Sequence, residues 1–82
     1  MIYLHKTGFP YKQFKNTYHM FADTIEELHA FADKIGLKRC WLHNSRTMKH
    51  YDVFGLKFVK ACDEGAEIVD TKFLIEFIKM VR

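Results

Sequence analysis

Residues 23–37, with the sequence DTIEELHAFADKIGL, carry the clearest helical pattern of the chain. Asp23 and Glu26 stand three positions apart at its start, which is typical of a capping pair that satisfies free backbone N–H groups. Apolar residues then recur at helical spacing, and Gly36 follows the last of them, where a left-handed C-cap is common. The apolar positions are Ile25, Leu28, Phe31, Ala32 and Ile35. The pattern predicts an amphipathic helix over 25–35 with one buried face.

Short β-forming segments lie on the N-terminal side of this helix. Residues 1–5 and 17–21 are predicted to be strands, and the intervening residues 6–16 contain Gly8, Pro10 and three lysines, which favours an exposed loop. Beyond the helix, residues 39–43 are predicted to form a third strand. A polar loop at 44–49 and a short extended piece at 50–53 follow.

Two more helices are predicted in the C-terminal half. The first has an apolar side and is expected to stop at Gly65; that side consists of Phe54, Phe58, Val59 and Cys62. A strand is expected at 66–69. The last helix begins at a cap, Asp70 or Thr71, and its apolar stripe consists of Leu74, Phe77, Ile78 and Val81. Because Phe73 and Ile75 flank this stripe, the last helix also suggests a homo-oligomer.

This order of strands and helices predicts an α/β (α+β) fold, formed by residues 1–82 as a single small domain with a short mixed sheet and about three helices packed on it. A chain of 82 residues, 49% of them hydrophobic, is too short for two domains and too apolar to be disordered. Two cysteines are too few for a disulfide scaffold, and the longest apolar stretch is too short for a membrane span. We therefore expect a cytosolic protein.

The positive charge is concentrated in two segments. Residues 1–22 hold three lysines and no acid, and residues 36–60 hold six basic side chains against one acid, Asp52. If these segments meet in the fold, they favour a phosphate-bearing partner. The alternative is that they form ordinary solvated faces.

Histidine is the enriched chemical type, with five residues, and two groupings combine it with aspartate. His19 and Asp23 bracket the start of the first helix, whereas His50 and Asp52 share one side of an extended segment. Imidazole and carboxylate groups together are common in metal sites and acid/base pairs. His19, Asp23, His50 and Asp52 are therefore the candidate catalytic residues and the candidate ligands of a divalent metal.

Structural explanations exist for the same residues. Asp23 and Asp52 are each placed to cap a helix, and His19 fits a satisfied histidine beneath the first cap. Two weaker metal hypotheses are the helical stripe Glu26, His29 and Asp33, and the zinc half-site spacing of Cys40 and His43. A serine or cysteine nucleophile is not favoured, because Ser45 has no patterned base beside it.

Basic and aromatic residues surround the second histidine grouping. Arginine presents a fork of donors that matches phosphate oxygens, and exposed aromatic rings stack on bases. The candidate ligand-binding residues are Arg39, Arg46, Lys49, His19, His50, Tyr51 and Trp41. This combination favours a nucleotide or nucleic acid, although motifs of the common sequence-reading DNA-binding folds are absent.

At HMFADTIEELHAFADKIGL (19–37), HYDV (50–53) and GAEIV (65–69), the chain resembles a family of small bacterial and phage domains called domain of unknown function 4031. The resemblance covers nearly the whole chain. The positions that match the family pattern are His19, Asp23, Glu27, His29, Gly36, Arg39, His50, Tyr51, Asp52 and Gly65. It implies the fold and the position of the site, and a bacterial or phage origin. By analogy with other small phage domains, it also suggests an action against host defence.

One position departs from the family pattern. Where the resemblance implies an acid at the end of the first strand, this chain has His5 followed by Lys6. Imidazole can replace an acidic metal ligand, but a lysine beside it opposes a cation, which favours an anion instead.

Three functions therefore stay open. The first is a non-catalytic module that binds a phosphate-bearing ligand. The second is a metal-dependent phosphodiesterase or nuclease. The third is an interaction protein that docks on a host partner through the aromatic residues Phe9, Tyr11 and Phe14.

Overall fold

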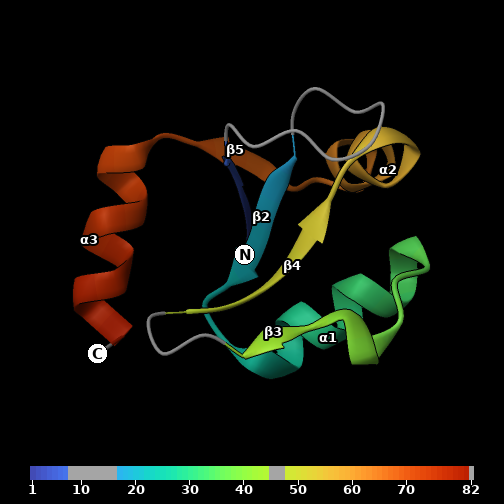
Figure 1. Cartoon of the computed structure of the whole chain (residues 1–82), viewed down its shortest axis with the longest axis horizontal. Coiled ribbons are helices and arrows are strands. Elements are labelled where there is room, and N and C mark those ends of the chain that lie inside the picture. Colours follow the sequence, from blue (N-terminus) through green and yellow to red (C-terminus); the bar gives the residue numbers. More distant parts are fainter. Residues whose placement is uncertain (8–16, 45–47, 82) are drawn as a thin grey trace.

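Five strands form one mixed sheet with helices on both faces in the computed structural model, which describes residues 1–7, 17–44 and 48–81 (Figure 1). The strands are β1 (Ile2–Lys6), β2 (Tyr18–Ala22), β3 (His43–Asn44), β4 (Lys49–Val53) and β5 (Glu67–Val69). The helices are α1 (Ile25–Ile35), α2 (Gly55–Asp63) and α3 (Thr71–Val81). The predicted α+β fold, with a mixed sheet and three helices, is confirmed. None of the helices in the described part is both long and apolar enough to cross a membrane.

The sheet has the strand order β3-β4-β2-β1-β5. Neighbouring strands are antiparallel except for β1 and β5, which are parallel. In the register, His5 of β1 lies opposite His19 of β2, which lies opposite Asp52 of β4. Three polar residues from distant parts of the sequence thus form one row across the central strands.

Helix α1 has the predicted length but a different N-cap. The cap is Thr24, whose side chain accepts a hydrogen bond from the Glu27 backbone N–H at 3.2 Å. Asp23 is one residue too early for this role, so the predicted Asp23 cap is wrong. Gly36 adopts the predicted left-handed conformation, with φ of 84°.

The face of the sheet that α1 and α2 cover is apolar. Strand residues such as Leu4, Met20 and Tyr51 are fully buried against Leu28 and Ala61 of these helices. A further prediction fails on α2. Val59 is 51% exposed, because the buried side of that helix is formed by residues 58, 61 and 62, at spacings of three and four.

Helix α3 covers part of the opposite face. Its Phe77 packs edge-on against Phe21 and Tyr3, with ring centroids 4.9 and 5.7 Å apart. The predicted cap at Asp70 is confirmed, since its Oδ1 accepts a hydrogen bond from the Phe73 backbone N–H at 2.9 Å. The helix lies at one side of the sheet (Figure 1), so it leaves β3 and β4 uncovered on this face.

The predicted strand at 39–43 is wrong. Residues Arg39–Trp41 form a turn of 3₁₀ helix, η1, closed by a hydrogen bond from the Trp41 N–H to the Lys38 carbonyl. Leu37 and Leu42 on either side pack into the core, and the four residues between them are pushed outward and exposed. The anchoring of both ends by burial outweighs the β propensity of the segment.

Candidate functional site

Three histidines and one aspartate lie on the part of the sheet that α3 leaves uncovered. His19 belongs to β2, His50 and Asp52 to β4, and His43 to β3, where it is paired with His50. Because side chains alternate along a strand, His50 and Asp52 emerge on the same face as His19. We call His19, His43, His50 and Asp52 the histidine cluster. Two of its members, His19 and Asp52, belonged to different predicted groupings, and the sheet register joins them.

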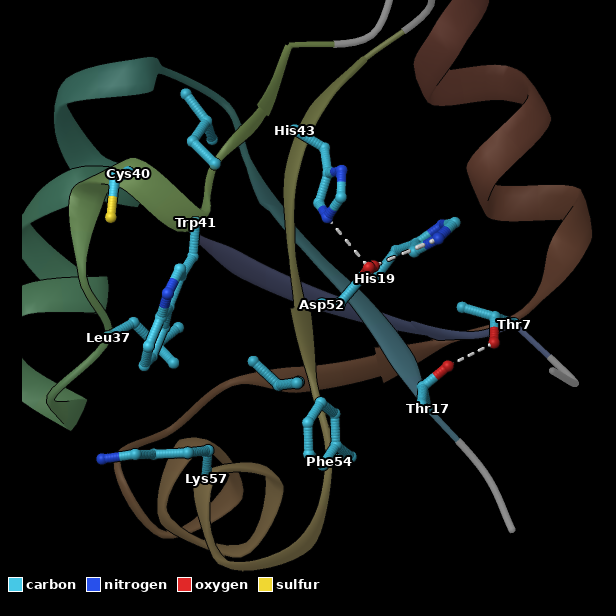
Figure 2. A pocket seen from close by; sticks show the side chains of 12 residues that line it. Thr7, Thr17, His19, Leu37, Cys40, Trp41, His43, Asp52, Phe54 and Lys57 are labelled. Atoms are coloured by element: carbon cyan, nitrogen blue, oxygen red, sulfur yellow. Dashed lines mark hydrogen bonds and ion pairs between the residues drawn. The ribbon is translucent and has the colours of Figure 1, made fainter. Parts of the chain in front are cut away.

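The Asp52 carboxylate is the centre of the cluster (Figure 2). Its Oδ1 lies 3.5 Å from His19 Nε2 and 3.7 Å from His50 Nε2, and its Oδ2 lies 3.1 Å from His43 Nε2. The side chain is 38% exposed as a whole, but Oδ1 is buried and has no hydrogen-bond partner. Buried carboxylate oxygens are normally satisfied, so this atom indicates a missing cation or donor.

The orientation of His50 is fixed by the backbone. Its Nδ1 lies 3.2 Å from the Met48 carbonyl oxygen, which can only accept, so Nδ1 must carry the proton. In the neutral ring, Nε2 then presents a lone pair toward Asp52 Oδ1. Metal-binding histidines are commonly held in this way by a carbonyl at the other ring nitrogen.

The surroundings of His19 disfavour its protonated form. Burial lowers its pKa below the ordinary value for histidine, and the neighbouring His50 acts in the same direction, against the opposing effect of Asp52. The His19 and His50 rings are tilted by 39° with centroids 4.1 Å apart. Two imidazoles beside one carboxylate are a donor set that a divalent transition metal prefers.

The spacing of the donor atoms fits a shared ion. One ligand atom each from His19, His50 and Asp52 can be chosen so that all lie within 4.8 Å of one another. Two atoms that each bind a tetrahedral ion at roughly 2.0–2.2 Å are roughly 3.3–3.6 Å apart. The observed 3.5 and 3.7 Å to Asp52 Oδ1 are close to that range. Over residues 1–7, 17–44 and 48–81, this is the one group of three metal-ligating side chains that meets the distance limit.

Asp23, predicted to belong to the site, lies elsewhere. Its carboxylate accepts a hydrogen bond from the Tyr3 hydroxyl at 3.0 Å and pairs with the N-terminal ammonium of Met1. Three extended residues of β2 separate it from His19, so it cannot share an ion with the cluster. The prediction that Asp52 caps α2 is also wrong, because Phe54 occupies the cap position without a side-chain hydrogen bond.

Tyr51 lies away from the histidine cluster. It points to the opposite face from His50 and Asp52, is fully buried in the core, and its hydroxyl lies 2.8 Å from His29 Nδ1. The prediction that its ring stacks on a ligand gains no support from this site, because strand alternation sends it inward.

The predicted basic residues do not converge on the cluster. Arg39 pairs with Asp33 of α1 at 3.0 Å, and Lys49 alternates with His50 and so belongs to the other face. Arg46 lies outside the described residues, as do Ser45, Phe9, Tyr11 and Phe14. Arg39 and Lys49 are therefore separated from the histidine cluster, and their binding of a phosphate stays a prediction without support from this site.

The departure from the family pattern at β1 has a structural explanation. His5 faces His19 across the β1–β2 pair, and its Nε2 lies 3.0 Å from the Thr71 hydroxyl oxygen. Lys6 is exposed and, by alternation, belongs to the other face of the sheet. It therefore does not oppose a cation in the cluster, contrary to the inference from sequence.

The two weaker metal hypotheses gain no geometric support. His29 bonds to Tyr51 and Asp33 to Arg39, so the helical stripe of α1 is occupied by other contacts. Cys40 and His43 both line the cavity described next, but no described side chain completes a zinc site with them.

A cavity of about 990 Å³ adjoins the histidine cluster (Figure 2). Its lining residues include His19, His43 and Asp52 at the cluster and apolar side chains between η1 and α2. The remaining lining residues are Thr7, Thr17, Leu37, Cys40, Trp41, Leu42, Val53, Phe54 and Lys57. Trp41, which was predicted to stack on a base, is half-exposed and lines this cavity, and its role in ligand binding stays a prediction.

Sequence reasoning missed His43 as a member of the cluster and Lys57 as the basic residue of the cavity. His43 enters because it pairs with His50 in the β3–β4 ladder. The sequence offered a signal for this pairing, because the two histidines flank a short polar loop, which is typical of a β-hairpin. Lys57 comes from α2, and its Nζ donates to the Ile35 carbonyl at 3.1 Å.

The model of the family described as "Protein of unknown function (DUF4031)" matches residues 2–81, essentially the whole chain, so the protein belongs to this family. No curated protein and no solved structure matches the chain.

Proposed function

We propose that this member of the DUF4031 family is a metal-dependent phosphodiesterase whose divalent ion is held by His19, His50 and Asp52. The observation that carries the proposal is the buried Asp52 Oδ1, which lacks a hydrogen-bond partner while two imidazole nitrogens lie 3.5 and 3.7 Å from it. A cation at this point would satisfy all three groups. Three protein ligands with an open position are typical of catalytic sites, whereas structural sites have four.

The residues around the ion have separable tasks in this proposal. His19 and His50 supply neutral nitrogen ligands, and the Met48 carbonyl holds the His50 ring in place. His43, 57% exposed, faces the second oxygen of Asp52 and the cavity, so it is placed to orient the carboxylate and to meet a bound ligand. A divalent ion supplies charge neutralisation for a phosphate group and lowers the pKa of water.

Metal binding is tested first. Chelator-stripped protein is titrated with Zn²⁺ and Mn²⁺ in a calorimeter, and one ion per chain is expected to bind. Asp52→Asn and His50→Gln should each weaken the affinity by about 100-fold or more, since even outer partners of a metal site contribute 10- to 100-fold. Asp23→Asn is the matched control, because this aspartate lies outside the cluster, and it should bind as wild type does.

Turnover is tested next with bis(p-nitrophenyl) phosphate. Hydrolysis should stop in chelator, return with the added ion, and disappear in Asp52→Asn. If neither the chelator nor the variants Asp52→Asn and His50→Gln reduce the rate of hydrolysis, the metal mechanism is refuted. An ion that binds without any phosphodiester hydrolysis would refute the enzymatic part of the proposal.

A phosphate-binding module without catalysis is the second candidate, because the cavity with Trp41 and Lys57 does not depend on an ion. Binding of a nucleotide that the metal-loaded protein leaves intact would favour it. The cytoplasmic location, the phage or bacterial origin and an action against host defence stay predictions.

Association with another protein is favoured by one surface. Phe73, Ile75 and Met80 of α3 are 38, 48 and 77% exposed. We propose that this helix forms a homo-oligomer or meets a host partner. Light scattering at micromolar concentration tests the first, and Met80→Glu should shift an oligomer toward monomer. A wild-type monomer would contradict it.

A further inference from the structure

We propose that the cavity beside the histidine cluster binds the base of a single nucleotide, with the ring against Trp41 and the phosphate toward His43. The inference rests on the proposed function and deepens it, because it names the substrate class as a phosphodiester of a single nucleoside, whose hydrolysis yields a nucleoside monophosphate. It distinguishes a mononucleotide-sized ligand from a nucleic-acid strand and from a simple phosphate ester.

The cavity has two chemically different ends. At one end lie the polar groups of His19, His43 and Asp52, and at the other the apolar walls formed by Leu37 and Trp41. A nucleotide has the same division, with a charged phosphate and a flat, largely apolar base. The volume of about 990 Å³ is at the upper end of the usual range for small-molecule sites.

Trp41 is exposed for a structural reason. Leu37 is 6% exposed and anchors the start of the segment, and the 3₁₀ turn then projects the indole outward, leaving it 48% exposed. Figure 2 shows the ring standing beside Leu37 and extending toward Lys57, at the border of the hollow. An indole held in this way, by a short turn with a buried anchor, offers a rigid stacking surface for a base.

The edge of β4 supplies polar groups next to this surface. Strand β3 pairs with β4 only at His43–His50 and Asn44–Lys49, and the chain before His43 departs into η1. Past His50, the edge of β4 therefore borders the cavity, which Asp52 and Val53 line. A strand edge presents backbone N–H and C=O groups, which can recognise the hydrogen-bonding edge of a base.

The charge around the cavity favours a small ligand over a strand. Among the described residues, Lys57 is the one lysine or arginine that lines it. Arg39 is turned to Asp33, and Lys6 and Lys49 belong to the other face. A polymer site needs a row of phosphate contacts and shows a steep loss of affinity with salt, whereas a mononucleotide here should show a shallow one.

Trp41 is the single tryptophan of the chain, so its fluorescence reports directly on this cavity. Full-length protein is titrated with adenosine and cytidine 5′-monophosphates, once in chelator and once with Zn²⁺. We expect saturable quenching by at least one of them in both conditions. Ribose 5-phosphate, which has the phosphate but no base, should leave the fluorescence unchanged.

Variants separate stacking from general folding. Calorimetry with the quenching nucleotide should give a Kd at least about fivefold higher for Trp41→Ala, the lower end expected for loss of base stacking, and within about twofold of wild type for Trp41→Phe. Phe73→Ala removes an exposed aromatic ring on α3, away from the cavity, and should leave the Kd unchanged. Protection of the exposed Cys40 thiol from a maleimide by the same nucleotide gives a second readout at the cavity wall.

Equal quenching by ribose 5-phosphate, or an unchanged Kd in Trp41→Ala, would overturn the base site. Tighter, steeply salt-dependent binding of a single-stranded oligonucleotide would overturn the restriction to one nucleotide. The two proposals fail separately. Quenching by nucleotides in a protein that binds no metal removes the phosphodiesterase and leaves the base site, whereas metal-dependent hydrolysis of bis(p-nitrophenyl) phosphate without nucleotide quenching removes the base site alone.

Discussion

The two faces of the central sheet are formed by the same three strands but have opposite chemistry. On one face, Leu4, Met20 and Tyr51 are fully buried beneath α1 and α2. On the other face, one residue away along each strand, stand His5, His19 and either His50 or Asp52. The covered face provides the stability that lets the other hold unsatisfied polar groups close together. In a domain of this size, one core has to support the whole fold.

The largest effect is expected on the covered face. Leu4→Ala should lower the free energy of unfolding by about 2–5 kcal/mol, because it leaves a cavity in a fully buried position. His5→Ala, the next residue on the other face, should lower it by about 1 kcal/mol or less, since it loses one hydrogen bond to Thr71. Urea denaturation measures both.

Equal losses in the two variants would contradict the division into a stabilising and a functional face. If Leu4→Ala does not fold, Ile2→Val on the same face should still cost about 1 kcal/mol.

Strand periodicity explains how much of this could be predicted. The alternation in residues 50–53 placed His50 and Asp52 on one face, and the 3.6-residue period of α1 identified its buried side. Tyr51 was misjudged because it stands between two polar residues in the sequence and was grouped with them. Strand alternation directs its ring to the opposite face, into the core. His43 and Lys57 were missed because their positions depend on sheet register and helix packing, which involve partners distant in sequence. Arg39 was misjudged because its partner, Asp33, lies six residues earlier on a helix whose end turns toward it.

A second prediction tests Tyr51 as a member of the covered face. Tyr51→Phe removes the hydrogen bond to His29 and should lower the free energy of unfolding by about 1 kcal/mol, while metal affinity and nucleotide affinity stay within about twofold of wild type. His50→Gln, one position earlier, should leave the free energy of unfolding close to wild type and should weaken ligand binding. A loss of ligand binding in Tyr51→Phe would restore the original prediction that this ring contacts the ligand.

A smaller effect is expected from pH on the metal-free protein. Because burial lowers the pKa of His19 in the folded state, the unfolded chain takes up a proton first as the pH falls below about 6.5. The free energy of unfolding should therefore be highest above that pH and should decrease as the pH falls toward the pKa of the folded state. Urea titrations in chelator at pH 7.5 and 5.5 measure the decrease, and His19→Gln should reduce it. An unchanged pH dependence in that variant would show that His19 is not the group responsible.

The smallest effect is expected from Arg39, the residue that the sequence made most attractive as a phosphate ligand. Its guanidinium and the Asp33 carboxylate are both largely exposed, and such ion pairs contribute little to stability. The arginine also holds the pKa of Asp33 below its usual range, as expected for an ion pair of this kind. Arg39→Gln should therefore leave the melting temperature and the nucleotide Kd close to wild type, whereas Lys57→Gln, at the cavity, should weaken nucleotide binding. The opposite ranking of these two variants would mean that the ligand approaches from the α1 side of η1, where Arg39 pairs with Asp33, instead of through the cavity beside the histidine cluster.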